Sequence, residues 1–97
     1  MPAYWMARAR VNTPDEYKKY AEQVPAILAK HGGKVLARGG DFKIMEGTDH
    51  FQRFVIIEFP TMEQGIACFN SEAYQSAASF RRTDGAGEVE IVMLDGI

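Results

Sequence analysis

The 97-residue sequence lacks the features that mark several common classes of protein. It has one cysteine, Cys68, which excludes an intramolecular disulfide and any zinc or redox motif built on paired cysteines. It has no long apolar run that could span a membrane. Its eleven basic residues are dispersed among thirteen acidic ones, and the formal net charge is −2. The sequence therefore has no basic patch of the kind that binds a nucleic-acid backbone. We therefore expect no membrane span and no nucleic-acid partner.

Other absences narrow the expectation further. The residues from Met1 to Trp5 lack the charged and apolar regions of a secretory signal, so we expect a cytoplasmic protein. His50 has no second histidine at ligand spacing, and the sequence predicts neither a metal site nor a cofactor. The same shortage of histidines argues against a haem held by a dedicated proximal ligand, and His31 is the one remaining candidate for that ligand. The length indicates a single domain over residues 1–97.

What the sequence does contain is one pattern that occurs twice. A two-sided apolar strand runs into a capping-box motif, in which a Thr is followed three residues later by Glu or Gln and both satisfy free N–H groups at a helix start. The two copies are Tyr4–Val11 followed by Thr13–Glu16, and Phe54–Phe59 followed by Thr61–Gln64. The pattern describes architecture and names no chemistry.

The remaining signals complete an element order of βαββαβ. We expect a bulged edge strand at Lys34–Arg38 with an extension over Phe42–Glu46, a short helix capped by Ser71 and a last strand over Glu88–Leu94. This order predicts an α+β, ferredoxin-like plait with an antiparallel four-stranded sheet of order 4-1-3-2. We expect strands one and three to be central and parallel to each other, with the helices on one face.

The face without helices should be apolar. Its expected residues are Tyr4, Met6, Phe54, Ile56, Val92 and Leu94. This patch is larger than an isolated soluble domain normally exposes. A homodimer through the open sheet face is the simplest closed solution, because a two-fold interface uses one self-complementary patch.

Several segments in combination resemble a known family. They are Tyr17, Tyr20, Pro25, His31–Lys34, Arg38–Gly40, Glu46–Gly47, Ile57–Thr61 and Glu72–Gln75. The chain resembles, over nearly its whole length, the domain-of-unknown-function 1330 family of the dimeric α/β-barrel superfamily. The resemblance implies the plait and a face-to-face homodimer, and it transfers no catalytic residue. Relatives in the superfamily include cofactor-free monooxygenases, haem-degrading enzymes, isomerases and plain ligand binders, so the fold cannot choose a reaction.

Charged residues on the sheet face without helices form a first candidate site. We expect Arg8 and Arg10 to lie beside Glu58, and opposite Glu88 or Glu90. One interpretation is a rim of cross-strand ion pairs that sets the dimer register. The other makes Glu58 a partly buried carboxylate beside an apolar dimer cavity, able to act as an acid or a base.

A second candidate site combines residues at helix and strand ends. His31 is either a helix C-terminal cap or a catalytic group. Arg81 and Arg82 at the end of a helix either complement its C-terminal charge or recognise a carboxylate or other anion at a pocket mouth. Tyr4 and Tyr74 could line such a pocket or belong to the core. The candidate ligand-binding residues are Tyr4, Arg8, Arg38, Tyr74, Arg81 and Arg82.

Two classes of function follow from these candidates. The first is a small-molecule-binding homodimer, with Glu58 and His31 as catalytic candidates for a cofactor-free, monooxygenase- or isomerase-like reaction on a small aromatic or lactone-like compound. The second is a non-catalytic structural or interaction module, whose role is to form the dimer. The sequence alone leaves both open.

Overall fold

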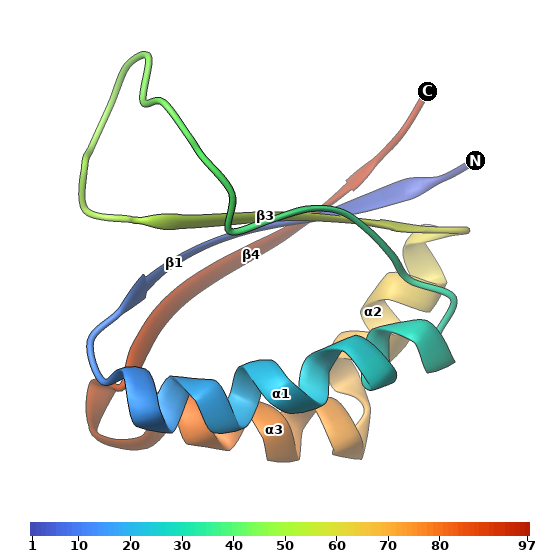
Figure 1. Ribbon diagram of the computed structural model, residues 1–97. Helices are drawn as coiled ribbons and strands as arrows, with labels where there is room; N and C mark the ends of the chain where they lie inside the picture. Colours follow the sequence, from blue (N-terminus) through green and yellow to red (C-terminus); the bar gives the residue numbers. More distant parts are fainter.

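A computed structural model describes residues 1–97 as two layers, a four-stranded sheet with helices on one face (Figure 1). The elements are β1 (Ala3–Val11), α1 (Pro14–Lys30), β2 (Lys34–Arg38), β3 (Arg53–Phe59), α2 (Met62–Asn70), α3 (Glu72–Arg82), the short 3-10 helix η1 (Thr83–Gly85) and β4 (Gly87–Asp95). The sheet order is β2-β3-β1-β4, and all neighbouring strands are antiparallel. This confirms the predicted plait, whose order 4-1-3-2 is the same order read from the other edge. No helix is both long and apolar enough to cross a membrane.

The direction of the two central strands corrects one expectation. β1 and β3 are antiparallel, with Tyr4 opposite Glu58 and Arg8 opposite Phe54. The reason is that α1 carries the chain back, so β2 runs in the direction of β1, and the loop after β2 then reverses the chain again. Glu58 and Arg8 therefore lie toward opposite ends of the shared face. The prediction that their charges meet was wrong.

Two of the three helix starts follow the capping pattern. The hydroxyls of Thr61 and Ser71 each accept a hydrogen bond from the backbone N–H three residues on, at 3.1 and 3.2 Å. Thr13 occupies the N-cap of α1, but its side chain makes no cap hydrogen bond. Pro14 holds the first helical position, where a residue without an N–H leaves one donor fewer to satisfy. The capping box predicted at Thr13 is therefore not formed.

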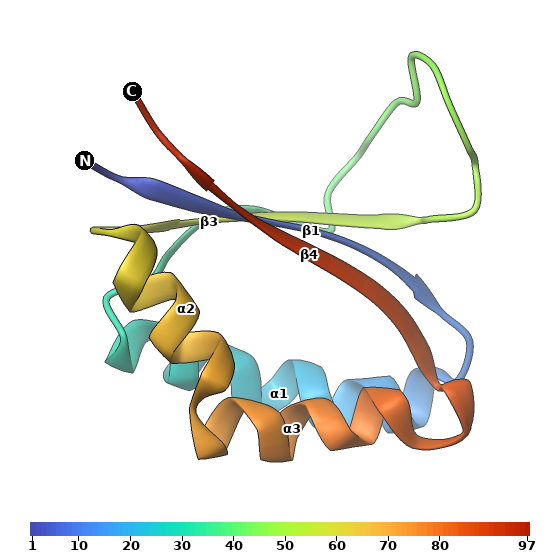
Figure 2. The same ribbon diagram turned by 180° about the vertical axis from the view of Figure 1, so that it is seen from behind.

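The sheet and the helices form two layers (Figure 2), and the buried core residues come from both of them. Trp5 lies at its centre, with its ring centroid 6.0 Å from that of Phe59 and 5.2 Å from that of Tyr74. Cys68 is fully buried nearby, and burial raises the pKa of its thiol to about 11. The thiol is therefore protonated and unreactive at neutral pH, as expected of a structural cysteine.

The opposite face of the sheet carries no helix (Figures 1 and 2). Four of its predicted apolar residues are 37–60% exposed, namely Met6, Ile56, Val92 and Leu94. They occupy neighbouring positions, since Met6 pairs with both Ile56 and Val92 across the central strand. We call these four residues the open face.

The segment from Gly39 to Gln52 differs from the prediction. It is a loop that rises on the side of the sheet away from the helices (Figure 1), and the extension expected over Phe42–Glu46 is not a strand. The ladder between β2 and β3 ends at the pair of Arg38 and Val55, because Gly39 has a positive φ of +60° and turns the chain away. The bulge predicted in this edge strand is present, between Val35 and Ala37.

Candidate functional site

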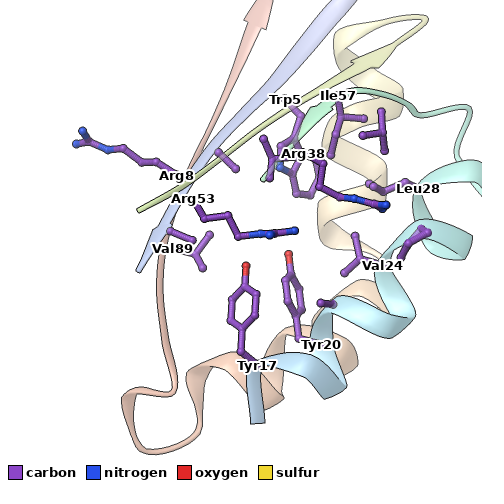
Figure 3. A pocket seen from close by; sticks show the side chains of 16 residues that line it. Trp5, Arg8, Tyr17, Tyr20, Val24, Leu28, Arg38, Arg53, Ile57 and Val89 are labelled. Atoms are coloured by element: carbon purple, nitrogen blue, oxygen red, sulfur yellow. The ribbon is translucent and has the colours of Figure 1, made fainter. Parts of the chain in front are cut away.

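A narrow cleft lies between α1 and the sheet (Figure 3). Apolar side chains dominate its walls, chiefly Trp5, Val24, Leu28, Val55, Ile57 and Val89. The cleft exists because the apolar stripe of α1 faces the inward-pointing residues of β1 and β3. Its volume is about 60 Å³, several times the roughly 10–15 Å³ that one water molecule needs. In this form it can take the head group of a small molecule.

Four polar side chains enter this cleft. Arg38 comes from the end of β2, Arg53 from the start of β3, and Tyr17 and Tyr20 from adjacent turns of α1. Figure 3 shows the Arg53 guanidinium reaching over the tips of both phenols, while Arg38 extends toward Leu28. We call these four residues the polar rim.

The two guanidinium groups of the polar rim have no carboxylate partner. The ion pairs of the chain are Arg8–Glu90, Lys18–Glu22, Lys19–Glu16 and His50–Glu88. The residues that line the cleft include no Asp, Glu or His. An arginine without an acidic partner beside apolar walls is suited to a planar anion, because its donors match a carboxylate in pairs. The cleft is thus a site of hydrogen-bond donors with an apolar floor.

Gly39 makes room for one of these groups. A Cβ atom at this position would collide with the guanidinium of Arg53. Gly39 also has the left-handed φ of +60°, and its N–H donates to the Phe54 carbonyl oxygen at 3.1 Å. The turn that ends β2 therefore also sets the space in which Arg53 enters the cleft.

Gly39→Ala should lower the free energy of unfolding by about 1–2 kcal/mol, because a left-handed backbone is costly for any residue with a Cβ atom. Gly40 is the matched control, since its φ is not positive and no atom lies within 4 Å of its Cβ position. Gly40→Ala should change stability by less than about 1 kcal/mol. Urea denaturation measures both variants. Equal stability of the two would contradict this account of the turn.

A buried polar cluster continues from the cleft into the helical layer. The Tyr20 and Tyr74 hydroxyls lie 2.8 Å apart, and Arg81 Nη2 donates to the Tyr74 hydroxyl at 3.3 Å. Arg81 is only 5% exposed, and its Nε has no hydrogen-bond partner. Burial is the main cause that raises the pKa of Tyr20 far above its ordinary value, so its phenol is protonated at neutral pH.

Glu58, the catalytic carboxylate predicted from the sequence, lies outside the cleft. Glu58 is on the face of the sheet away from the helices, where it accepts a hydrogen bond from the Tyr4 hydroxyl at 3.5 Å. Arg8 pairs with Glu90 at 2.7 Å on the same face, as the interpretation of cross-strand ion pairs expects. Arg10 donates to the His50 carbonyl oxygen at 3.1 Å. None of these polar contacts enters the cleft.

The other predicted site residues are divided between structure and the cleft. His31 follows α1, and its Nδ1–H donates to the Ile27 carbonyl oxygen at 3.0 Å, as a helix C-terminal cap does. Arg82 is exposed and donates to Gln75 at 2.8 Å. Arg38 and Arg8 are the predicted residues that line the cleft, but the Arg8 guanidinium points away from it (Figure 3). Tyr74 and Arg81 are not among the lining residues.

Sequence reasoning missed three of the four polar-rim residues. Tyr17 and Tyr20 lie on the buried stripe of α1, a position that by itself indicates packing. Arg53 shares its parity with Val55 and Ile57, which face the helices. That parity was the available signal, because a charged residue on an inward-facing position of a strand requires a cavity or a partner.

The sequence profile described as "Domain of unknown function (DUF1330)" matches residues 2–97, which confirms the resemblance found in the sequence. No curated protein matches the chain.

Several solved structures share the fold. A protein of unknown function from Rhodopseudomonas palustris superposes with a TM-score of 0.78 at 17% identity, covering 99% of this chain and 82% of its own. A dimeric ferredoxin-like protein of unknown function from Jannaschia sp. CCS1 gives 0.77 at 10% identity, covering 99% and 100%. SnoaB, a cofactor-independent oxygenase from Streptomyces nogalater, gives 0.65 at 13% identity, covering 99% and 93%. At such identities these likenesses describe the fold alone.

Proposed function

This chain belongs to the domain-of-unknown-function 1330 family, and we propose that it binds a small organic anion in the cleft between α1 and the sheet. The single observation that carries the proposal is the pair of guanidinium groups, Arg38 and Arg53, which face an apolar cleft without any carboxylate partner. Arg53 is half-buried, and a half-buried charge without a partner is costly, so an anionic ligand would supply that partner. Arg38 is exposed to solvent and adds a second cationic group to the same cleft.

Shape and chemistry narrow the ligand class. The apolar walls suit a flat ring, and the donors suit a carboxylate or an enolate on that ring. A volume of about 60 Å³ is smaller than such a ring acid, so binding requires the long side chains of Arg38 and Arg53 to move outward and make room for the ring. The proposed ligand is therefore a small aromatic or lactone-like acid.

The cleft favours binding over acid–base catalysis. No carboxylate or imidazole lines it, so it holds no general base at neutral pH. The likeness to a cofactor-independent oxygenase supports a cofactor-free reaction only for a ligand that enters already ionised. On such a ligand the polar rim would stabilise negative charge on an oxygen atom.

Arg53→Met should weaken the binding of 2-furoate, a five-membered ring with a carboxylate, by about tenfold. The methionine keeps the apolar length of the side chain and removes the charge-assisted hydrogen bonds, which contribute about 1.5–3 kcal/mol. Isothermal titration calorimetry with 2-furoate and benzoate measures the effect. The neutral methyl esters of both acids should bind more weakly to the unaltered protein.

Arg82→Met is the control, because Arg82 is exposed and lies outside the cleft. It should leave the affinity for 2-furoate unchanged. Equal affinities for the acids and their esters, or an unchanged affinity of Arg53→Met, would contradict the proposal. If neither acid binds, the non-catalytic interaction module is the better reading.

We further propose that two copies pair through the open face. Four adjacent apolar side chains there are 37–60% exposed, and one self-complementary patch suffices for a two-fold dimer. The Jannaschia protein with the same fold is dimeric, which supports the proposal. Pairing would leave the cleft free, because the cleft lies on the helical side of the sheet.

A further inference from the structure

The buried cluster of Tyr20, Tyr74 and Arg81 has a defined direction of hydrogen bonding. Arg81 Nη2 lies 3.3 Å from the Tyr74 hydroxyl oxygen and can only donate, because a guanidinium has no acceptor. The Tyr74 hydroxyl therefore accepts from Arg81. Tyr74 is 0% exposed, so water cannot take its own hydroxyl hydrogen.

The hydrogen of Tyr74 has one available acceptor. The Tyr20 hydroxyl oxygen lies 2.8 Å away, and no other side-chain hydrogen bond is made by Tyr74. If Tyr20 donated to Tyr74 instead, the Tyr74 hydrogen would be buried without a partner, which native proteins avoid. In the arrangement that leaves no hydrogen of Tyr74 unpaired, Arg81 donates a hydrogen bond to Tyr74, and Tyr74 donates one to Tyr20.

This arrangement leaves the hydrogen of Tyr20 unused. Tyr20 lines the cleft, and Figure 3 shows its hydroxyl directed toward the Arg53 guanidinium, which cannot accept a hydrogen bond. The Tyr20 ring is held in place, with Arg81 Cζ lying 5.1 Å from its centroid. The hydroxyl is therefore a fixed donor whose acceptor must come from a molecule in the cleft.

We propose that Arg81 and Tyr74 orient the Tyr20 hydroxyl as a hydrogen-bond donor to a ligand oxygen, and that Tyr20 selects ligands whose inner group is an acceptor. The inference rests on the proposed anion-binding function and adds a third donor to the two guanidinium groups. The ligand class becomes a ring acid whose carboxylate or enolate oxygen points toward α1. Tyr20 is the contact residue, and Tyr74 and Arg81 are positioning residues.

An NMR measurement on the ligand-free protein tests the direction of the hydrogen bonds between Arg81, Tyr74 and Tyr20. With tyrosine labelled with 13C at Cζ and dissolved in equal parts of H2O and D2O, a slowly exchanging hydroxyl gives two Cζ lines, one for each isotope, and a rapidly exchanging hydroxyl gives one. We expect two lines for Tyr74, whose hydrogen is buried between two residues, and one line for Tyr20. Addition of 2-furoate should split the Tyr20 line. Two lines for Tyr20 and one for Tyr74 without ligand would overturn the inference.

Variants test the selection. Tyr20→Phe should weaken 2-furoate binding about tenfold, and Tyr74→Phe, which keeps the Tyr20 hydroxyl, about threefold. Tyr4→Phe is the matched control on the face away from the helices and should have no effect. If Arg53→Met weakens binding and Tyr20→Phe does not, the inference fails and the anion site stands. If Arg53→Met has no effect, the anion site itself fails, and the isotope pattern still decides the direction of the hydrogen bonds.

Discussion

Val92→Asp should convert the protein from a dimer to a monomer. Val92 is 60% exposed in the single chain, so an aspartate there remains solvated and the fold of the monomer loses little. In a two-fold dimer through the open face the same substitution buries two carboxylates, one from each copy. Each would lose several kcal/mol of hydration without a cationic partner. Light scattering at micromolar concentration should give about twice 10.8 kDa for the unaltered chain and 10.8 kDa for the variant.

Ile66→Asp is the control for this substitution. Ile66 is 44% exposed and lies on α2, in the helical layer on the other side of the sheet. This variant should remain dimeric, because it adds the same charge away from the open face. A monomeric unaltered chain, or dimers of both variants, would contradict the proposed interface.

Phe59→Ala should lower the free energy of unfolding by about 3–5 kcal/mol, the range for removing a large aromatic side chain from a packed core. Phe59 is 0% exposed and stacks on Trp5 with a centroid distance of 6.0 Å. Its ring also supports the chain at Gly33, where a Cβ atom would lie only 3.0 Å from it. The loss is a large share of the roughly 5–15 kcal/mol that a domain of ordinary stability has. Urea denaturation, analysed by linear extrapolation, measures it.

Phe42→Ala is the matched control for the core substitution. Phe42 is 49% exposed on the loop between β2 and β3, and its ring lies 4.9 Å from that of Phe54. Its truncation should cost less than half as much as that of Phe59, because little of the ring leaves an apolar environment. Equal losses for the two variants would show that the core is not centred between the sheet and the helices.

The fold could be predicted from local signals because those signals agreed with one another. Alternating apolar residues defined the strands, and the Thr61 and Ser71 caps form as the motifs indicate. The error over strand direction came from topology, which no local pattern contains. Phe42–Glu46 has the composition of a strand, yet the positive φ of Gly39 ends the pairing before it.

The cleft was harder to predict than the fold. Its donors come from α1, β2 and β3, so they meet only once the register of the sheet is known. Arg38 was among the candidate ligand-binding residues of the second predicted site. Arg53 and Tyr20 were not, because each has a position typical of packing. Both residues become candidates for anion binding only because no carboxylate lies near them in the cleft. The three-dimensional structure shows this, and the sequence does not.

An NMR titration with 2-furoate tests the central claim most directly. In a 1H–15N spectrum that includes side chains, the largest shift changes should fall on the Arg53 Nε–H and the Trp5 indole N–H, since both residues line the cleft. Backbone signals of Met6 and Val92 on the open face should move little. Unchanged signals at Arg53 and Trp5, or changes confined to the open face, would contradict the account of an anion-binding cleft.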